Sequence, residues 1–321
     1  MSISMTERKP AFHIQPRHLL LVGLLTLAFY VLLPQLGDFR SSWQLLRHPD
    51  ALFTALAVLL TFGTYAAGAG TYCFLAFRPL SFSRTLLVQF AAMFVNRLLP
   101  AGLGAVGVNY LYLRHARHKT SQAVSVVAIN NLLGFMGHGL ILLVTILVAS
   151  GTSSIQPVHH GSNQTRIIGV VASILAILMI FGLIYGHHKV TATLKDTKTQ
   201  LLSYRLRPLS LIGALCTSVA LTLCNVLALA CCMHALGLIL PFAVVVLVFT
   251  FGISAGAAVP TPGGLGGFEA GLAAGFVAYG IDPAPALATA LLYRLVSYWL
   301  PIMAGLLAFI VCQKRRLFSV A

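Results

Sequence analysis

Long runs of apolar residues dominate this chain, with little of the alternation between apolar and polar positions that marks a half-buried strand. Six of the runs are long enough to cross the hydrocarbon core of a bilayer, which takes about 20 residues of helix. They are residues 18–36, 51–77, 121–150, 167–186, 209–235 and 285–312. The pattern predicts an all-α polytopic membrane protein with six full transmembrane helices.

Two further apolar regions, residues 85–113 and 241–281, are interrupted near their middles by proline and glycine. The first contains LPAGLG and the second contains TPGGLGGFE. Proline removes a backbone donor and glycine permits a positive φ, so each helix is expected to break there. The freed backbone groups must be buried in protein or line a wet cavity, since lipid cannot satisfy them. We therefore predict two re-entrant helical hairpins.

The positions of the basic residues predict the orientation of these elements. Lys and Arg concentrate in the N-terminal segment, around residues 78–84 and 114–119, in the loop 187–208 and in the C-terminal tail. The positive-inside rule then places both termini in the cytoplasm, and the two hairpins enter from opposite faces of the membrane.

Each half of the chain, 1–160 and 161–321, thus reads as two spans, a hairpin and a third span, in opposite orientations. This arrangement predicts an inverted-topology repeat within a single transmembrane domain, residues 1–321. Paired interruptions in corresponding segments of a repeat indicate a transport site near the midplane. The alternative is that the glycines serve only close packing between helices.

Composition agrees with a membrane location. The chain is 58% hydrophobic and 8% charged, with a mean hydropathy of +0.91. Its net charge of +15 would favour a nucleic-acid partner in a soluble protein, but here membrane orientation accounts for most of the basic residues. The first apolar run is long and lacks a small-residue cleavage site, so we expect a retained helix and no signal peptide.

Three ionisable side chains, Arg97, Glu269 and Arg294, fall inside apolar stretches. A charge at the centre of a membrane helix costs roughly 2.5–3.5 kcal/mol on insertion scales, so such residues usually pair or face water. We hypothesise that Glu269 pairs with one of the two arginines in one conformation and leaves an arginine free for a lipid phosphate in another. The alternative is a static structural pair.

Other chemistry finds little support in the sequence. The stretch GLGAVG at 102–107 matches a dinucleotide-binding pattern, but no acidic residue follows it before Asp196. The six cysteines show no C-x-x-C spacing, and the six acidic residues are scattered. We expect no enzymatic activity, no cofactor and no metal. Without a nucleotide motif, any transport would be driven by a gradient or by substrate supply.

Three segments carry a resemblance to a known family: NRLLPAGLG at 96–104, PGGLGGFE at 262–269 and LLYRLVSYWLP at 291–301. They resemble the signature segments of the lysylphosphatidylglycerol synthase transmembrane region family, over roughly residues 18–312. The resemblance implies a flippase-like protein of the bacterial inner membrane. It also implies a substrate-binding set consisting of Asn96, Arg97, Pro100, Gly102, Gly104, Pro262, Gly264, Gly266, Glu269 and Arg294.

The chain departs from the family in two respects. Only a short basic tail follows the last span, so we expect the aminoacyl-transferring domain of bifunctional relatives, and with it synthase activity, to be lacking. Where relatives often place an acidic residue after the first break, this chain reads AVGVN at 105–109, which argues against a cationic headgroup on that side.

These observations together predict a flippase or scramblase for an anionic or aminoacylated membrane phospholipid. Two alternatives stay open at this point. One is a secondary transporter for a small solute or ion built on the same repeat, and the other is a membrane partner subunit of a lipid-modifying enzyme.

Overall fold

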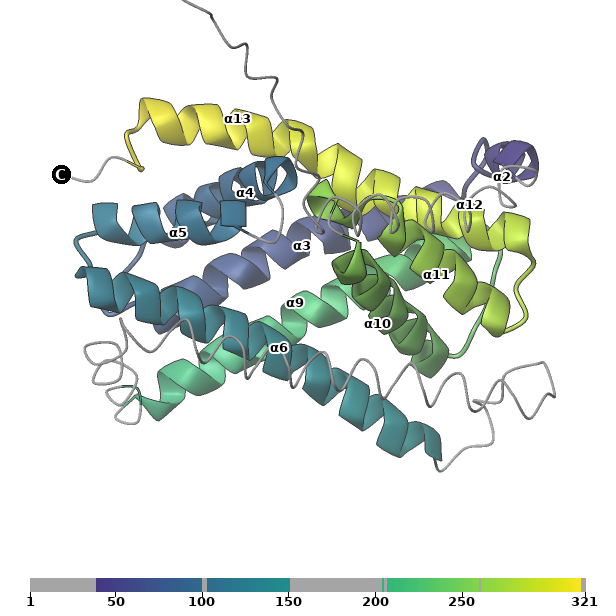
Figure 1. Ribbon diagram of the computed structural model, residues 1–321, viewed down its shortest axis with the longest axis horizontal. Helices are drawn as coiled ribbons and strands as arrows, with labels where there is room; N and C mark the ends of the chain where they lie inside the picture. The colour runs from purple at the N-terminus through teal and green to yellow at the C-terminus, as the bar shows by residue number, and fades with distance from the viewer. Residues whose placement is uncertain (1–38, 100–102, 151–203, 205–206, 260, 319–321) are drawn as a thin grey trace, which may run out of the picture.

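The computed structural model describes residues 39–99, 103–150, 204, 207–259 and 261–318. All regular structure in these residues is helical, without a strand (Figure 1), which confirms the all-α prediction. The predicted spans 18–36 and 167–186 lie outside the described residues.

Four helical segments are long and apolar enough to cross a membrane. They are α3 (Ala51–Leu75), α6 (Thr120–Ser150), α9 (Pro208–Ala235) and the continuous stretch of α12 (Pro283–Arg294), η5 (Leu295–Trp299) and α13 (Leu300–Lys314). They correspond closely to the predicted spans 51–77, 121–150, 209–235 and 285–312.

Local sequence explains where these helices begin. The Asp50 carboxylate caps α3 by accepting a hydrogen bond from the N–H of Phe53 at 3.0 Å. Helices α9 and α12 both begin with proline in the first turn, where a missing N–H costs nothing. A short helix, α2 (Phe39–Leu45), precedes α3 and is tied to α12 by the Ser42 hydroxyl, which donates to the carbonyl of Ala284 at 2.9 Å.

Each of the two interrupted regions forms a pair of packed helices, so the predicted interruption of both is confirmed. The first consists of α4 (Phe82–Leu98) and α5 (Leu103–His115). The second consists of α10 (Phe242–Ala258), the short turn η4 (Pro262–Gly264) and α11 (Gly267–Ala278). They lie at opposite ends of the long axis in Figure 1, with their breaks towards the middle, where α4 contacts η4.

Helices α3 and α9 pack together along the centre of the molecule. Small residues allow this close approach: a Cβ placed on Gly70 would lie 3.0 Å from Cγ2 of Thr217. The hydroxyls of Thr71 and Thr217 form an interhelical hydrogen bond of 2.9 Å. Small side chains and hydroxyl pairs are the usual means of holding helices together in lipid.

Each hairpin is held by its own apolar cluster. Val245 of α10 and Leu272 of α11 pack with Leu229 of α9 and Leu292 of α12, whereas the first hairpin packs against α13. Helix α6 instead exposes large apolar side chains, which suits a lipid-facing helix. They include Leu132, Phe135, Met136, Leu140, Leu143, Val144, Leu147 and Val148.

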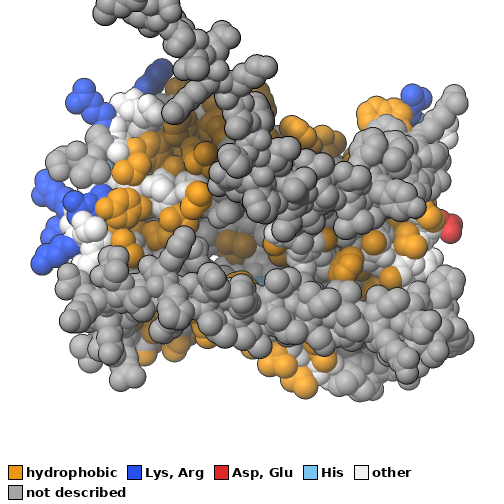
Figure 2. Space-filling view, in the orientation of Figure 1, with side chains coloured by type: hydrophobic (Ala, Val, Ile, Leu, Met, Phe, Trp, Pro, Cys, Tyr) orange, Lys and Arg blue, Asp and Glu red, His pale blue; other side chains and the backbone are white. Residues whose placement is uncertain are grey.

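Most of the described basic side chains lie at one end of the molecule, the left end in Figure 2. The helix ends and connections on this side of Figure 1, at the end of α3, the start of α4, the α5–α6 connection, the start of α9 and the end of α13, carry Arg78, Arg84, Arg114, Arg117, Lys119, Arg207, Lys314, Arg315 and Arg316 in the sequence. Contacts between elements hold this end together: Arg207 donates to the carbonyl of Ala76 at 3.4 Å, and the N–H of Arg78 donates to His118 at 3.2 Å. The first hairpin and α13 have their termini here, so the molecule is electrostatically polarised along its length.

Candidate functional site

The break of the second hairpin is built from glycines that no other residue could replace without strain. Gly263 and Gly264 have φ values of +65° and +66°, a region that L-residues with a Cβ rarely adopt. A Cβ on Gly263 would also collide with the Tyr298 ring, and one on Gly264 would lie 2.9 Å from the carbonyl oxygen of Gly256. The turn thereby aims the carbonyls of both glycines at α12.

Glu269 sits in the first turn of α11, directly after this break. Its Oε2 accepts a hydrogen bond from the N–H of Gly266 at 2.8 Å, as in a capping box. A carboxylate at this position also interacts favourably with the positive end of the helix dipole. The side chain therefore stabilises the start of α11.

Arg294, the last residue of α12, bonds to residues on both sides of the second break. Its Nε lies 2.7 Å from Oε1 of Glu269. Its Nη2 donates to the carbonyl oxygens of Gly263 and Gly264 at 3.1 and 3.2 Å. The guanidinium also stacks 4.3 Å from the centroid of the Phe268 ring. Arg294 thus has a charge partner, two carbonyl acceptors and an aromatic face.

Arg97, near the end of α4, has far fewer partners although it is only 8% exposed. Its Nη2 donates to the carbonyl of Ser297 at 2.8 Å. Its Nε and Nη1 have no hydrogen-bond partner among the described residues. Unsatisfied buried donors are rare in native proteins and call for an explanation, such as a ligand or an ordered water.

The sequence explains why the carbonyl of Ser297 is available to accept a hydrogen bond from Arg97. In an α-helix the carbonyl of Ser297 would accept from the N–H of residue 301, but residue 301 is proline. Residues Leu295–Trp299 accordingly form a short π-helical segment. Such segments are often found at functional sites.

Tyr298, within this segment, lies between the two arginines. The centroid of its ring is 4.0 Å from Cζ of Arg97 and 5.0 Å from Cζ of Arg294. The ring of Tyr298 therefore makes cation-π contacts with both arginines. The carboxylate of Glu269, in contrast, forms its ion pair with Arg294. Arg97 is left as the cation without an acidic partner among the described residues.

The first break is closed by Asn96 and Gly104. Oδ1 of Asn96 accepts a hydrogen bond from the N–H of Ala105, in the first turn of α5, at 3.3 Å. A Cβ on Gly104 would lie 2.5 Å from the carbonyl oxygen of Val95, so α5 approaches α4 as closely as backbones allow. For this glycine, close helix packing is a sufficient physical reason.

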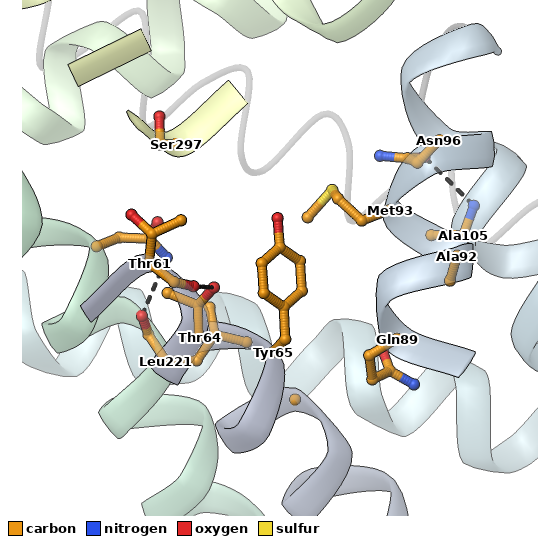
Figure 3. A pocket seen from close by; sticks show the side chains of 12 residues that line it. Thr61, Thr64, Tyr65, Gln89, Ala92, Met93, Asn96, Ala105, Leu221 and Ser297 are labelled. Atoms are coloured by element: carbon orange, nitrogen blue, oxygen red, sulfur yellow. Dashed lines mark hydrogen bonds between the residues drawn. The ribbon is translucent and has the colours of Figure 1, made fainter. Parts of the chain in front are cut away.

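Beside Asn96 lies a cavity of about 150 Å³ between α3, α4, α5, α9 and η5, drawn in Figure 3. Its lining residues carry hydroxyls, amides and small or apolar groups, and none is charged. They are Thr61, Thr64, Tyr65, Gly68, Gln89, Ala92, Met93, Asn96, Ala105, Leu221, Asn225 and Ser297. An uncharged chamber whose wall mixes polar and apolar groups thus lies within the apolar helical bundle.

Arg97 lies next to this chamber, although it is not one of the residues that line it. Its neighbour Asn96 and its acceptor Ser297 both line the cavity. The Tyr65 side chain, which projects into the chamber in Figure 3, lies within hydrogen-bonding and electrostatic reach of Arg97. Arg97 and the chamber are therefore linked through Asn96, Ser297 and Tyr65.

Comparison with known protein families identifies relatives of this chain. The model of a family described as the lysylphosphatidylglycerol synthase TM region matches residues 19–305. The chain belongs to this family. The match confirms the resemblance seen in the three motif segments and identifies a multi-pass membrane protein connected with lipid metabolism. No curated protein matches the chain.

Most of the predicted site residues lie in two neighbouring groups in this family member. Gly264, Gly266, Glu269 and Arg294 meet at the second break, together with the backbone of Pro262. The other group, Asn96, Arg97 and Gly104, lies at the first break, and Tyr298 links the two groups. Pro100 and Gly102 lie outside the described residues.

Sequence reasoning missed the chamber itself. Its wall on α3 consists of Thr61, Thr64, Tyr65 and Gly68, which follow the spacing i, i+3, i+4, i+7 of one helical face. A polar or small stripe at helical spacing within a membrane span was therefore the available signal. None of these four residues ionises at neutral pH, so they did not stand out among the charged residues of the apolar stretches.

Proposed function

We propose that this protein moves phospholipids between the two leaflets of a bacterial inner membrane, as a flippase or scramblase. One observation carries the proposal: an uncharged chamber with hydroxyls and amides in its wall lies beside Arg97, a buried cation that has no acidic partner among the described residues. A phospholipid headgroup needs such a polar path through hydrocarbon, and its phosphate needs a cation. Membership of a family linked by its description to a phospholipid-modifying synthase supports the same substrate class.

The helix arrangement supports a transport role. In our proposal the two hairpins are re-entrant and belong to inverted repeats, with the basic end of the molecule in the cytoplasm. Both breaks then lie near the membrane midplane, where alternating access places a substrate site. The termini would face the cytoplasm, although residues 1–38 and 319–321 lie outside the described part of the chain.

In this proposal the two arginines and Glu269 have different roles. Arg97 neutralises the phosphate of the headgroup while the chamber accommodates the remaining polar groups. Glu269 and Arg294 keep the second hairpin folded against η5, and their exchange of partners with Arg97 would open the path. The acyl chains stay in lipid along exposed apolar faces such as that of α6.

Translocation can be measured directly in reconstituted liposomes. Lipids labelled on an acyl chain with a fluorophore are bleached by a membrane-impermeant reductant, which reaches only the outer leaflet unless the protein exchanges the leaflets. We expect wild-type protein to make inner-leaflet phospholipid reachable. The variant Arg97→Gln should slow this by about ten- to a hundredfold, the value of a lost charge-assisted hydrogen bond.

The exposed Arg84 at the basic end provides the matched control. Arg84→Gln removes the same charge without touching the chamber and should translocate at the wild-type rate. If folded wild-type protein moved no phospholipid, the proposal would be rejected in favour of a small-solute or ion transporter, or of a subunit that requires an enzyme partner.

A further inference from the structure

The continuous helical stretch of α12, η5 and α13 consists of two halves that pack against different hairpins. Helix α13 packs on α4 of the first hairpin, so closely that a Cβ on Gly305 would lie 2.8 Å from the Cβ of Phe94. Helix α12 packs on α11 of the second hairpin and is tied to α2 by the bond from Ser42 to Ala284. We call α4, α5 and α13 the first body, and α10, α11 and α12 the second body.

The helices within each body approach one another too closely to slide easily. In the first body, a Cβ on Gly104 of α5 would lie 2.5 Å from the carbonyl oxygen of Val95 in α4. In the second body, a Cβ on Gly271 of α11 would lie 2.6 Å from the Cβ of Ala255 in α10. Close-packed regions move as units because they resist continuous deformation. A relative movement of the two hairpins would therefore be taken up where α12 joins α13, which is η5.

The backbone of η5 is bonded less regularly than that of the helices beside it. The N–H of Leu300 donates to the carbonyl of Leu295, five residues earlier, as in a π-helix. Pro301 has no N–H to donate, and the carbonyl of Ser297 accepts from Nη2 of Arg97 instead. Sharp kinks in helices occur mainly at prolines and at π-helical turns, and η5 combines the two.

Tyr298 holds η5 against both bodies at once. Its ring lies 4.0 Å from Cζ of Arg97, in the first body, and 5.0 Å from Cζ of Arg294, in the second. It also packs against Gly263, between α10 and α11, where a Cβ would collide with the ring. A rotation of one body away from the other would have to separate Tyr298 from one of these partners.

We propose that η5 is a hinge about which the second body rotates relative to the first, and that the contacts of Tyr298 hold the arrangement of this structure. The assignment rests on the proposed function and names the motion that serves it, since transporters built from repeats work by rocking one part against another. Helix α12 has 12 residues and is about 18 Å long, so a kink of about 20° at η5 would carry its far end by about 6 Å.

Distances between pairs of nitroxide labels test the motion without requiring translocation. The labels are attached to genetically encoded ketone side chains, which leaves the native cysteines intact, and are measured by double electron–electron resonance in nanodiscs. The exposed Arg84 and Gln313 report within the first body, whereas Arg84 paired with the exposed Val277 or Asp282 reports between the bodies. We expect one narrow distance within the first body and two populations between the bodies.

Two substitutions should shift these populations in opposite directions. Tyr298→Leu removes the ring that contacts both arginines, so the share of the moved population should rise by about fivefold. Adding Pro301→Ala to Tyr298→Leu supplies a backbone donor for the carbonyl of Ser297, and this bond across the junction should lower that share by about fivefold. Pro283→Ala is the matched control, because Pro283 lies in the first turn of the same helix, where no donor is missing.

Three outcomes would overturn the hinge. The first is a single narrow distance between the bodies in both the wild type and Tyr298→Leu. The second is an equal response to Pro301→Ala and Pro283→Ala. The third is a broadening of the Arg84–Gln313 distance together with the others, which would show general loosening. The proposed function fails separately: hinge motion without leaflet exchange would reject translocation alone, and leaflet exchange with one fixed distance between the bodies would reject this inference alone.

Discussion

Arg294 and Glu269 form an ion pair, with Nε of the arginine 2.7 Å from Oε1 of the carboxylate, that joins the end of α12 to the first turn of α11. Both side chains are largely buried, and each makes further bonds to the backbone of the second break. The sequence had left two arginines competing for this carboxylate. The pairing found here gives Glu269 a structural partner and leaves Arg97 available.

We predict that Glu269→Gln lowers the free energy of unfolding by about 3–5 kcal/mol, because it leaves the Arg294 charge buried without its counter-ion. The double variant Glu269→Gln/Arg294→Met should recover much of this loss, since it removes both charges together. Unfolding of the single and double variants in detergent gives the coupling energy through a double-mutant cycle.

Asp282 supplies the control for this cycle, because it precedes α12 without forming a side-chain cap. Asp282→Asn should change stability little. Strictly additive effects of the Glu269 and Arg294 substitutions would show that the pair contributes no coupling energy, contrary to this prediction.

Gly104 and Gly107, one turn apart on α5, should respond in opposite ways to alanine. A Cβ on Gly104 would lie 2.6 Å from the backbone of Asn96, whereas a Cβ on Gly107 meets nothing within 4 Å. Gly104→Ala should therefore cost about 1–3 kcal/mol through overpacking. Gly107→Ala should be neutral or stabilise by up to about 1 kcal/mol, because alanine favours the helix. Thermal unfolding of the two variants would contradict the packing argument if the losses were equal.

Hydropathy predicted the described helices well because lipid imposes a simple rule on sequence. The predicted span 121–150 became α6, Thr120–Ser150. Helix α4 ends and α5 begins on either side of the interruption at LPAGLG, and α10 and α11 lie on either side of TPGGLGGFE. Residues of a span must be compatible with hydrocarbon, and the backbone polar groups at a helix break must be shielded from lipid. Both requirements restrict the sequence strongly, so both can be recognised in it.

The site was less predictable, because tertiary geometry decides it. Arg294 rather than Arg97 binds Glu269 because the positive φ angles of Gly263 and Gly264 direct two carbonyls at α12. No property of the two arginines in isolation could reveal that choice. The acceptor of Arg97 was predictable in part, since Pro301 leaves the carbonyl of Ser297 without its helical donor.

Substitution of Arg97 should separate function from stability. Arg97 is buried without an acidic partner among the described residues, so the cost of removing its charge from water offsets much of what its hydrogen bond to Ser297 and its contact with Tyr298 contribute. Arg97→Met keeps an unbranched side chain that can pack against Tyr298, and we expect the free energy of unfolding to change by no more than about 1 kcal/mol. Phospholipid translocation should nevertheless fall by about tenfold or more.

The comparison is Arg294→Met, which removes a fully engaged arginine and should destabilise the protein as Glu269→Gln does. Parallel unfolding and translocation measurements decide the matter. Severe destabilisation by Arg97→Met, matching that of Arg294→Met, would mean that Arg97 is also a structural residue.

His118 should make the basic end of the protein sensitive to pH. It lies in the turn between α5 and α6, where its Nδ1 is 3.1 Å from the carbonyl of Leu113 and its Nε2 accepts from the N–H of Arg78 at 3.2 Å. These partners require the neutral imidazole, with its proton on Nδ1. Burial lowers the pKa of His118 below its ordinary value of 6.5, so the unfolded chain takes up a proton more readily than the folded protein.

The contribution of His118 to stability is therefore complete above pH 6.5 and is lost progressively as the pH falls below that value. We expect the unfolding temperature in detergent to fall between about pH 6.5 and pH 5 in the wild type. His118→Gln should flatten this slope, because glutamine does not titrate. His48→Gln removes an exposed histidine and should leave the slope unchanged. If the slope persisted in His118→Gln, the pH sensitivity would have to reside in another group, and the proton balance assigned to this turn would be wrong.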